Sequence, residues 1–281
     1  MHSVKQSEAT LAFIGAGNMA CAIIGGLLKQ GYPAEKIIAT ARSAESQQRA
    51  KALGLTQVHA DNRAAVSTAD VVILAVKPQM MRDVIGGFAD LLRSGQLFIS
   101  VAAGLETTTL AGWLNPQHNF TPAIVRCMPN TPALVGLGAS GLFANPQVHD
   151  TQKALCAYLF NAVGISVWVD DENLMDAVTA VSGSGPAYVF MVLEAMQNAA
   201  GQLGLPADIA RQLSLQTVLG AATLATQSND APAELRRKVT SPGGTTERAI
   251  NTFEQGQLRE LFVSAMTAAR DRGAELAALN R

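Results

Sequence analysis

Two glycine-containing segments have the residue types best suited to bind anions. The first is Ser241-Pro242-Gly243-Gly244-Thr245-Thr246, directly before a predicted helix. Glycines leave backbone N–H groups accessible, and the first N–H groups of a helix attract negative charge. A capped turn with Thr245 as N-cap is the plain alternative. An ordinary cap does not need Ser-Pro-Gly-Gly ahead of it, so we expect a carboxylate-binding loop.

The second segment is Gly15-Ala16-Gly17-Asn18-Met19-Ala20, between a predicted strand and a predicted helix. Gly15 permits a tight turn, and Gly17 lets the backbone approach a pyrophosphate at the helix N-terminus. Small residues are common at such joints, so this pattern alone is weak. Its place in a strand–turn–helix–strand unit of about 30 residues favours dinucleotide binding.

The residues after the next predicted strand indicate which dinucleotide is bound. NAD enzymes place an acid here to take the ribose hydroxyls. This chain has Ala41-Arg42-Ser43 and no acid before Glu45. The guanidinium of Arg42 and the hydroxyl of Ser43 suit a phosphate monoester, although Arg42 as a solvated loop residue is the alternative. The missing acid predicts NADP.

Two further strand ends should meet the same ligand, because ligands bind at the carboxyl edge of open α/β sheets. One ends in Ala75-Val76-Lys77-Pro78, where Lys77 is suited to contact the cofactor. The other ends in Val101-Ala102-Ala103, whose small side chains leave room for a flat nicotinamide ring.

The elements that must position these residues change character near residue 169. Before it, continuous apolar runs alternate with amphipathic stretches, as in a doubly wound parallel sheet covered on both faces. The predicted strands are Leu11–Gly15, Lys36–Thr40, Val71–Val76, Leu97–Ala103, Ala123–Cys127 and Ile165–Val169. The helices predicted between them are Asn18–Gln30, Ser43–Leu53, Gln79–Leu92, Thr107–Trp113 and Gln147–Ala162.

After residue 169 the sequence predicts helices and no strand. They are Asp171–Val181, interrupted after its end by Ser182–Pro186, then Ala187–Leu203, Ala207–Thr226, Ala231–Val239, Thr245–Glu254 and Leu258–Leu279. We therefore predict an α/β protein with a Rossmann-type domain at 1–169 and an all-helical domain at 170–281. The helix Ala207–Thr226 is apolar on most faces and must be buried. A small helical domain cannot easily bury it alone, which favours a dimer interface.

Composition narrows the class of ligand. The 281 residues are 48% hydrophobic with a formal net charge of -1, which offers no electrostatic footprint for nucleic acid or a membrane surface. The three cysteines are far apart in sequence, and the first ten residues are polar. We expect free thiols, no metal site and a cytoplasmic location. A small-molecule ligand is the best expectation.

The predicted helical domain is poor in proton-accepting bases: it contains Lys238 as its one lysine and no histidine. A dehydrogenase that removes an alcohol proton needs such a base near the hydride site. Reduction of an imine that is already protonated does not.

Taken together, these motifs resemble the pyrroline-5-carboxylate reductase family along nearly the whole chain. The segments that carry the resemblance are Phe13–Met19, Ala75–Gln79, Arg126–Pro132, Ala180–Tyr188 and Leu235–Ile250, with Val239–Thr246 at the centre of the last. The pattern Gly15–Ala20 by itself is not specific for this family, but the five segments together are.

The resemblance implies reduction of the imino acid Δ1-pyrroline-5-carboxylate to L-proline by NADPH, with NADH also usable. It implies that the Ser-Pro-Gly-Gly loop holds the substrate carboxylate and that catalytic Thr246 hydrogen-bonds the ring nitrogen. It also implies a homodimer through the helical domain, and a ring of five such dimers. The implied substrate residues are Ser241, Gly243, Gly244, Thr245 and Thr246. The implied cofactor residues are Ile14, Gly15, Ala16, Gly17, Asn18, Met19, Ala41, Arg42, Ser43, Asn62, Ala75, Val76, Lys77, Pro78, Val101, Ala102 and Ala103.

Two other functions are weighed against this one. A β-hydroxyacid dehydrogenase also joins a Rossmann domain to helices, but it uses a lysine on the first long helix of the second domain, and 171–203 contains none. A redox sensor would bind NADP without turnover, and it would not need an anion loop facing the nicotinamide.

Overall fold

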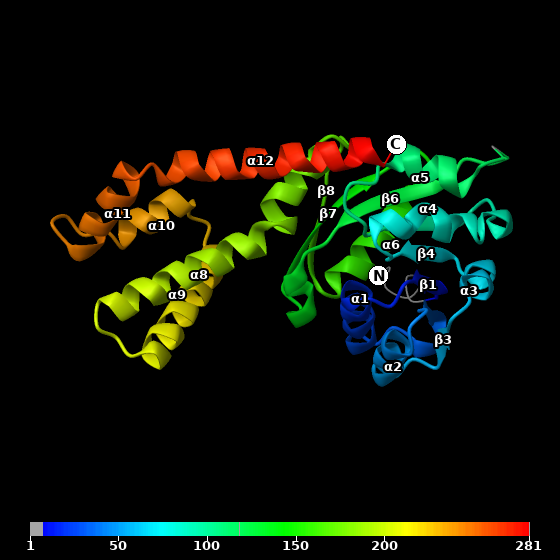
Figure 1. The fold of residues 1–281 in the computed structure, drawn as a ribbon, viewed down its shortest axis with the longest axis horizontal. Coiled ribbons are helices and arrows are strands. Elements are labelled where there is room, and N and C mark those ends of the chain that lie inside the picture. The colour runs from blue at the N-terminus through cyan, green and yellow to red at the C-terminus, as the bar shows by residue number, and fades with distance from the viewer. Residues whose placement is uncertain (1–7, 118, 281) are drawn as a thin grey trace. The chain divides into compact units, whose positions relative to one another are not determined.

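The computed structural model describes residues 8–117 and 119–280 (Figure 1). The chain divides into two compact units. The sheet unit comprises Met1–Ser184 with Ala269–Arg281, and the helical unit comprises Gly185–Ala268. The last strand ends at Trp168, yet the helical residues up to Ser184 pack with the sheet unit. The domain boundary at residue 169 stays a prediction.

The sheet unit contains eight strands in the order β3-β2-β1-β4-β5-β6-β7-β8. Strands β1 to β6 are mutually parallel, β7 is antiparallel to β6, and β8 is parallel to β7. Their bounds are β1 Leu11–Ile14, β2 Ile37–Thr40, β3 Gln57–His59, β4 Val71–Leu74, β5 Leu97–Ser100, β6 Ala123–Met128, β7 Gly138–Ala144 and β8 Gly164–Trp168. The predicted Rossmann-type α/β fold is confirmed.

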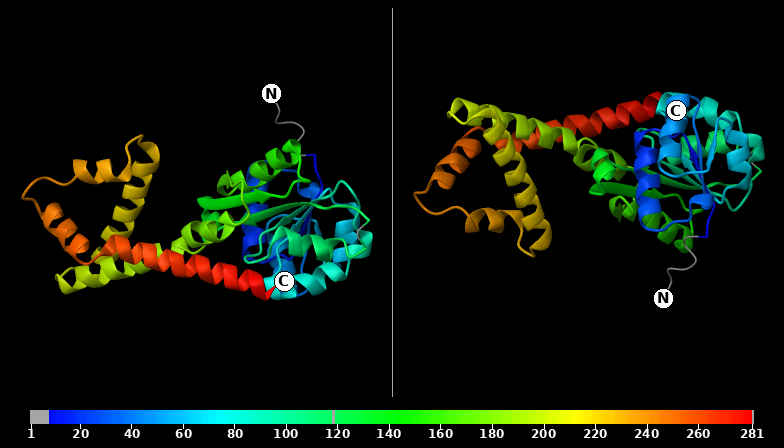
Figure 2. Two further views of the ribbon diagram at one scale, coloured as in Figure 1. Left: turned by 90° about the horizontal axis from the view of Figure 1, so that it is seen from above. Right: turned by 90° about the horizontal axis from the view of Figure 1, so that it is seen from below.

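Helices cover both faces of this sheet (Figure 2). Alternate residues of β1 point to opposite faces, so Leu11 and Phe13 join one apolar core and Ala12 and Ile14 join the other. The first core is closed by α1 (Asn18–Lys29), α2 (Ala44–Ala52) and α6 (Asp150–Asn161). The second is closed by α3 (Asn62–Thr68), α4 (Pro78–Gly86) and α5 (Thr107–Leu114). Three short turns lie between these elements: η1 (Ala34–Lys36) precedes β2, η2 (Ala89–Leu91) precedes β5, and η3 (Thr131–Val135) precedes β7.

Three elements of the sheet unit have no counterpart in the sequence prediction: β3, α3 and β7. β3 has only three residues and no apolar run, and α3 is shorter than two full turns. β7 contains Gly138 and Gly141, which lowers its strand propensity. A Cβ on Gly141 would lie 2.3 Å from Val178 Cγ1, so this glycine allows a helix to pack on the strand.

The predicted interruption at Ser182–Pro186 is smaller than expected. α7 (Leu174–Val178) continues into the π-helical segment η4 (Thr179–Gly183), and α8 (Gly185–Gln202) follows directly. Ser184 between them keeps right-handed helical angles. The helix also begins at Leu174 rather than at Asp171, because Asp171 accepts a hydrogen bond from the Asn173 N–H in a turn ahead of it.

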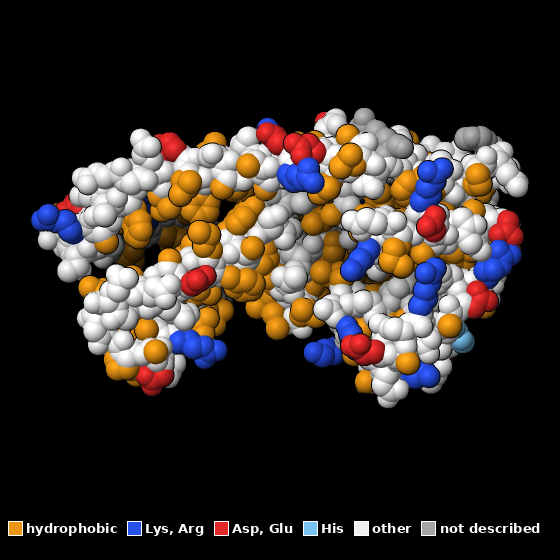
Figure 3. All heavy atoms as spheres, viewed as in Figure 1, with side chains coloured by type: hydrophobic (Ala, Val, Ile, Leu, Met, Phe, Trp, Pro, Cys, Tyr) orange, Lys and Arg blue, Asp and Glu red, His pale blue; other side chains and the backbone are white. Residues whose placement is uncertain are grey.

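The helical unit consists of α8, α9 (Ala207–Gln227), α10 (Pro232–Lys238), α11 (Thr245–Gln255) and the first part of α12 (Leu258–Leu279). The single chain leaves the apolar helix α9 largely exposed, and its burial in a dimer interface stays a prediction. Leu213, Leu219 and Leu224 of α9 are more than half exposed, and apolar side chains gather over α8 and α9 (Figure 3). One chain has too few elements to cover this helix on every side. None of the described helices is long and apolar enough to cross a membrane.

Two adjacent glycines of α1 allow a matched test of packing against the sheet unit. A Cβ on Gly26 would lie 2.5 Å from both the Ala162 carbonyl oxygen and Val163 Cγ1. We expect Gly26→Ala to lower the free energy of unfolding by about 1–3 kcal/mol through overpacking.

The control is Gly25→Ala, since a Cβ there would approach only Leu53 Cδ2, at 3.8 Å. It should raise the free energy of unfolding by up to about 1 kcal/mol, because alanine favours helix. Urea unfolding at one protein concentration measures both values, and equal effects of the two substitutions would contradict the packing described.

Candidate active site

The turn after β1 lies against the turn after β4, at the point where the strand order reverses. Gly15 has φ = 101°, and a Cβ there would lie 2.9 Å from the Ala75 carbonyl oxygen and 2.9 Å from Val76 Cγ1. The Ala75 N–H donates to the Ile14 carbonyl at 2.9 Å. Only glycine combines this left-handed conformation with this approach. Open α/β sheets bind ligands at such a reversal.

The first turn of α1 presents bare backbone at this edge. Gly17 is its N-cap and supplies no side-chain cap, and nothing lies within 4 Å of the position a Cβ would take. The N–H groups of the first turn have no intrahelical acceptors. A helix N-terminus that has no side-chain cap and has space beside its N-cap glycine fits the pyrophosphate of a dinucleotide.

Arg42 and Ser43 follow the end of β2, and they differ in whether they already have hydrogen-bond partners. Ser43 is the N-cap of α2, and its hydroxyl oxygen accepts from the Ser46 N–H at 3.2 Å. The sequence argument assigned this hydroxyl to a phosphate, whereas its position also serves the helix. Arg42 is exposed and has no hydrogen bond or ion pair among residues 8–117 and 119–280. Its guanidinium is therefore available to a phosphate.

A second arginine, which the sequence analysis did not single out, lies at the same edge. Arg49 of α2 donates through Nη1 to Asn18 Oδ1 in the first turn of α1. Its Nη2 lies 2.9 Å from Glu45 Oε1. The i,i+4 spacing of Glu45 and Arg49 could have indicated the ion pair. The contact with α1 depends on tertiary structure.

The other predicted cofactor residues also follow carboxyl ends of parallel strands. Lys77 is exposed and precedes Pro78, the first residue of α4. Asn62 begins α3 after β3 and is half-buried. After β5, the buried Ala102 donates its N–H to Ser100 Oγ at 3.3 Å, while Ala103 is exposed. The structure thus brings the predicted residues to one edge of the sheet.

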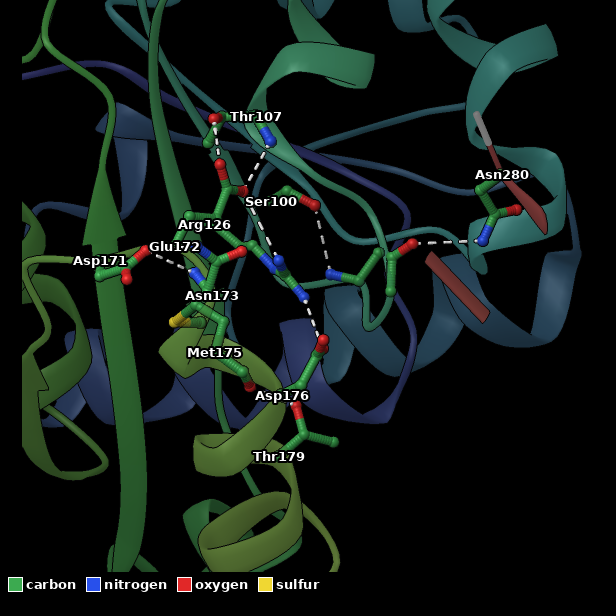
Figure 4. Close-up of polar contacts among 12 residues, drawn as sticks. Ser100, Thr107, Arg126, Asp171, Glu172, Asn173, Met175, Asp176, Thr179 and Asn280 are labelled. Atoms are coloured by element: carbon green, nitrogen blue, oxygen red, sulfur yellow. Dashed lines mark hydrogen bonds and ion pairs between the residues drawn. The ribbon is translucent and has the colours of Figure 1, made fainter. Parts of the chain in front are cut away.

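A buried ionic network lies beside the chain that follows β5 (Figure 4). Arg126 of β6, paired in register with Ser100 of β5, has a side chain only 5% exposed. Its guanidinium nitrogens lie 3.5 Å from Glu172 Oε1 and 3.5 Å from Asp176 Oδ1. Glu172 also accepts from the N–H of Thr107 at 2.8 Å and from its hydroxyl at 2.6 Å. The sequence analysis included Arg126 in a motif without assigning it a role.

This network holds helical segments of the sheet unit against the sheet. A Cβ on Gly273 of α12 would lie 3.1 Å from Asp176 Oδ1, so the helix backbone passes close to the carboxylate. Further along α12, Asn280 donates its side-chain amide to the Gly104 carbonyl at 3.2 Å. Two residues that follow the predicted nicotinamide segment 101–103, Gly104 and Thr107, are thus held by contacts with later parts of the chain.

The three cysteines are buried and free. Burial raises the pKa of the Cys127 and Cys156 thiols well above the usual range, and burial also raises the pKa of Cys21 despite nearby Arg49. Burial therefore favours the neutral thiol over the thiolate, which is the nucleophilic form. No cluster of potential metal ligands occurs among the described residues.

The Ser241–Thr246 segment uses two of its own N–H groups internally. Gly243, with φ = 71°, donates to Glu247 Oε2 at 2.8 Å, and Gly244 donates to the Ser241 carbonyl at 3.0 Å. The N-cap of α11 is Gly244, so the alternative with Thr245 as N-cap is wrong. The N–H groups of Thr245, Thr246 and Glu247 form the first turn and lack intrahelical acceptors.

A hollow lies against this loop within the helical unit, with a volume of about 350 Å³. It is lined by Gly243, Gly244, Glu247, Arg248, Asn251, Thr252 and Gln255. The sequence analysis missed Glu247, because its contact with Gly243 appears only once the loop is folded.

Comparison with known proteins identifies the family. The family model described as "Pyrroline-5-carboxylate reductase dimerisation" matches residues 172–276, and "NADP oxidoreductase coenzyme F420-dependent" matches residues 10–104. The pyrroline-5-carboxylate reductase of Pseudomonas aeruginosa is 51% identical over 273 residues, which cover 96% of this chain and 98% of that protein. The chain belongs to the pyrroline-5-carboxylate reductase family.

Solved structures of family members agree along the same length. The reductase of Coxiella burnetii has a TM-score of 0.90 at 45% identity, covering 96% of this chain and 98% of that one. The Plasmodium falciparum protein, solved with NADP bound, has a TM-score of 0.83 at 28% identity and covers 96% and 99%. A 3-hydroxyisobutyrate dehydrogenase of Mycobacterium tuberculosis, at 18% identity and a TM-score of 0.51, shares the fold alone.

The ionic network generates a stability prediction. Arg126→Met should lower the free energy of unfolding by about 3–5 kcal/mol, because Glu172 and Asp176, whose side chains are only 21% and 19% exposed, would lose the guanidinium that pairs with both. Denaturant unfolding with fixed protein concentration measures the change.

The matched control is Arg270→Met, which removes an ion pair with Asp271 whose side chains are both 54% exposed. It should leave the unfolding midpoint almost unchanged. Shifts of similar size for the two variants would contradict the role given to the buried network.

Proposed function

We propose that this protein reduces Δ1-pyrroline-5-carboxylate to L-proline with NADPH, the final step of proline biosynthesis. The observation that carries the proposal is that one chain contains two helix N-termini suited to bind anions. A dinucleotide edge with a bare helix N-terminus occurs together with a second anion-binding helix N-terminus bearing threonine hydroxyls. The chain also matches the pyrroline-5-carboxylate reductase of Pseudomonas aeruginosa over 96% of its own length and 98% of that protein.

The dinucleotide edge fits NADPH, which when bound supplies a hydride from its nicotinamide. The N–H groups at the start of α1 receive the pyrophosphate, and Arg42 pairs with the 2′-phosphate. The small side chains at 101–103 leave space for the ring. NADH has the same pyrophosphate and nicotinamide ring and lacks only the 2′-phosphate, so it should also act as the hydride donor.

The loop before α11 fits the substrate carboxylate. The N–H groups of Thr245, Thr246 and Glu247 are the available donors, because those of Gly243 and Gly244 bond within the loop. Glu247 and Ser241 then act by fixing the loop rather than by touching the substrate. A carboxylate held at the helix N-terminus would place the ring nitrogen beside the Thr246 hydroxyl.

The chemistry requires orientation more than proton transfer. The protonated imine accepts a hydride at carbon and becomes an amine, so no base must act in the same step. The Thr246 hydroxyl accepts a hydrogen bond from the iminium N–H and keeps the ring in place while its charge disappears. Holding two reactants in line supplies much of a rate enhancement. This agrees with a helical region that contains a single lysine and no histidine.

Two finer points belong to the same proposal. The exposed apolar side chains of α8 and α9 would be covered in a homodimer formed through the helical unit, as the matched dimerisation region suggests. We propose further that five such dimers form a ring. We propose no nucleic-acid or membrane partner.

The role of Thr246 gives a kinetic prediction. Thr246→Ala should lower kcat/KM for pyrroline-5-carboxylate by roughly 100-fold, because the ring would lose the hydroxyl that orients it and a small misplacement of reactants can cost about that factor. NADPH oxidation followed at its nicotinamide absorbance measures the rate. Thr68→Ala is the control, because Thr68 is exposed at the end of α3 and its hydroxyl donates only to the Ala64 and Ala65 carbonyls of that helix. Unchanged kinetics in Thr246→Ala would refute the assignment.

The role of Arg42 gives a selectivity prediction. Arg42→Ala should weaken NADPH by about tenfold and leave NADH within twofold, because only NADPH has the phosphate that a guanidinium binds. The ratio of kcat/KM values with the two cofactors measures the change, and an unaltered ratio would contradict the phosphate contact.

A further inference from the structure

Arg49 joins two helices at the edge of the sheet where the cofactor is expected. It belongs to α2, yet its Nη1 donates to Asn18 Oδ1 in the first turn of α1. Its Nη2 lies 2.9 Å from Glu45 Oε1. The hydrogen bond to Asn18 keeps the guanidinium between the N-terminal turns of α1 and α2, while the side chain remains 39% exposed.

Glu45 is the acid that this arginine contacts, and its position matters for the cofactor. It is the first acid after β2 and lies in the first turn of α2, two residues after the N-cap Ser43. An acid near this place is how NAD enzymes repel a 2′-phosphate. The Glu45 side chain is 85% exposed.

The formal charges of three side chains near the ends of these helices bear on whether the site binds NADPH or NADH. Arg42 and Arg49 contribute two positive charges and Glu45 one negative charge, which leaves a net charge of +1 beside the expected phosphate. With Arg49 removed, the formal charges of Arg42 and Glu45 would sum to zero, and the Glu45 carboxylate would lose its counter-charge. A carboxylate without a counter-charge repels the 2′-phosphate of NADPH and not the hydroxyl of NADH.

We propose that Arg49 is a positioning residue that makes this protein prefer NADPH by neutralising Glu45. This inference rests on the proposed function, because it assumes that the dinucleotide site lies at the start of α1 and α2. Arg49 acts through Glu45 and does not itself bind the 2′-phosphate. Direct contact of Arg49 with the pyrophosphate is the competing explanation, and it would affect NADPH and NADH alike.

The test compares Arg49→Gln, Glu45→Gln and the double variant with wild type. Dissociation constants for NADPH and NADH are measured on the full-length protein by nicotinamide fluorescence, without substrate. Lys51→Gln is the matched control, because it removes an exposed positive charge from the same helix. We expect Arg49→Gln to weaken NADPH roughly fivefold, with NADH and Lys51→Gln within about twofold of wild type. The NADPH effect should shrink as ionic strength rises.

The double variant decides the mechanism. Glu45→Gln combined with Arg49→Gln should bring NADPH binding back to within about twofold of wild type, because the unpaired carboxylate is gone. Equal losses for the two cofactors, no loss for either, or failure of Glu45→Gln to restore NADPH would each overturn the inference. If wild type bound NADPH but did not oxidise it with pyrroline-5-carboxylate, the proposed function would fail while these binding constants still tested Arg49.

Discussion

The backbone of the turn after β1 runs against the carbonyl of Ala75 because Gly15 has no Cβ, and the cofactor edge depends on this close approach. It sets the first turn of α1 beside the point where the strand order reverses. The ends of β2, β4 and β5 then lie around that helix N-terminus in fixed register. Any side chain at Gly15 would separate the two turns and disturb the place where the pyrophosphate is expected.

A second constraint operates where the sheet meets its last helices. Arg126, Glu172 and Asp176 are charged groups in a poorly solvated place, so each needs the others. Apolar residues could fill the same space, but the ion pair of Arg126 with Asp176 also fixes which side of α7 faces β6. These three residues have no part in the proposed hydride transfer, and their role is to hold the chain that follows β8 against the sheet.

The sequence predicts this molecule well where a local pattern has one physical meaning. Continuous apolar runs identified β1, β4 and β5, and Gly15 with Gly17 marked the turn. The short β3 and the glycine-containing β7 were missed, because tertiary packing rather than propensity makes them strands. At the site, Arg42 could be chosen from sequence alone. The bonds of Arg49 to Asn18 and of Glu247 to Gly243 could not, because they join groups whose proximity only the folded chain defines.

The central claim is that a hydride passes from the nicotinamide to the imine carbon of pyrroline-5-carboxylate. Incubating the wild-type protein with pyrroline-5-carboxylate and NADPH deuterated at the nicotinamide C4 position that is transferred tests it directly, with NMR of the product as the measurement. Our account predicts L-proline with one deuterium at C5, the carbon beside nitrogen that does not bear the carboxylate. Absence of proline, or proline without deuterium at C5 from either C4-deuterated form of the cofactor, would contradict it.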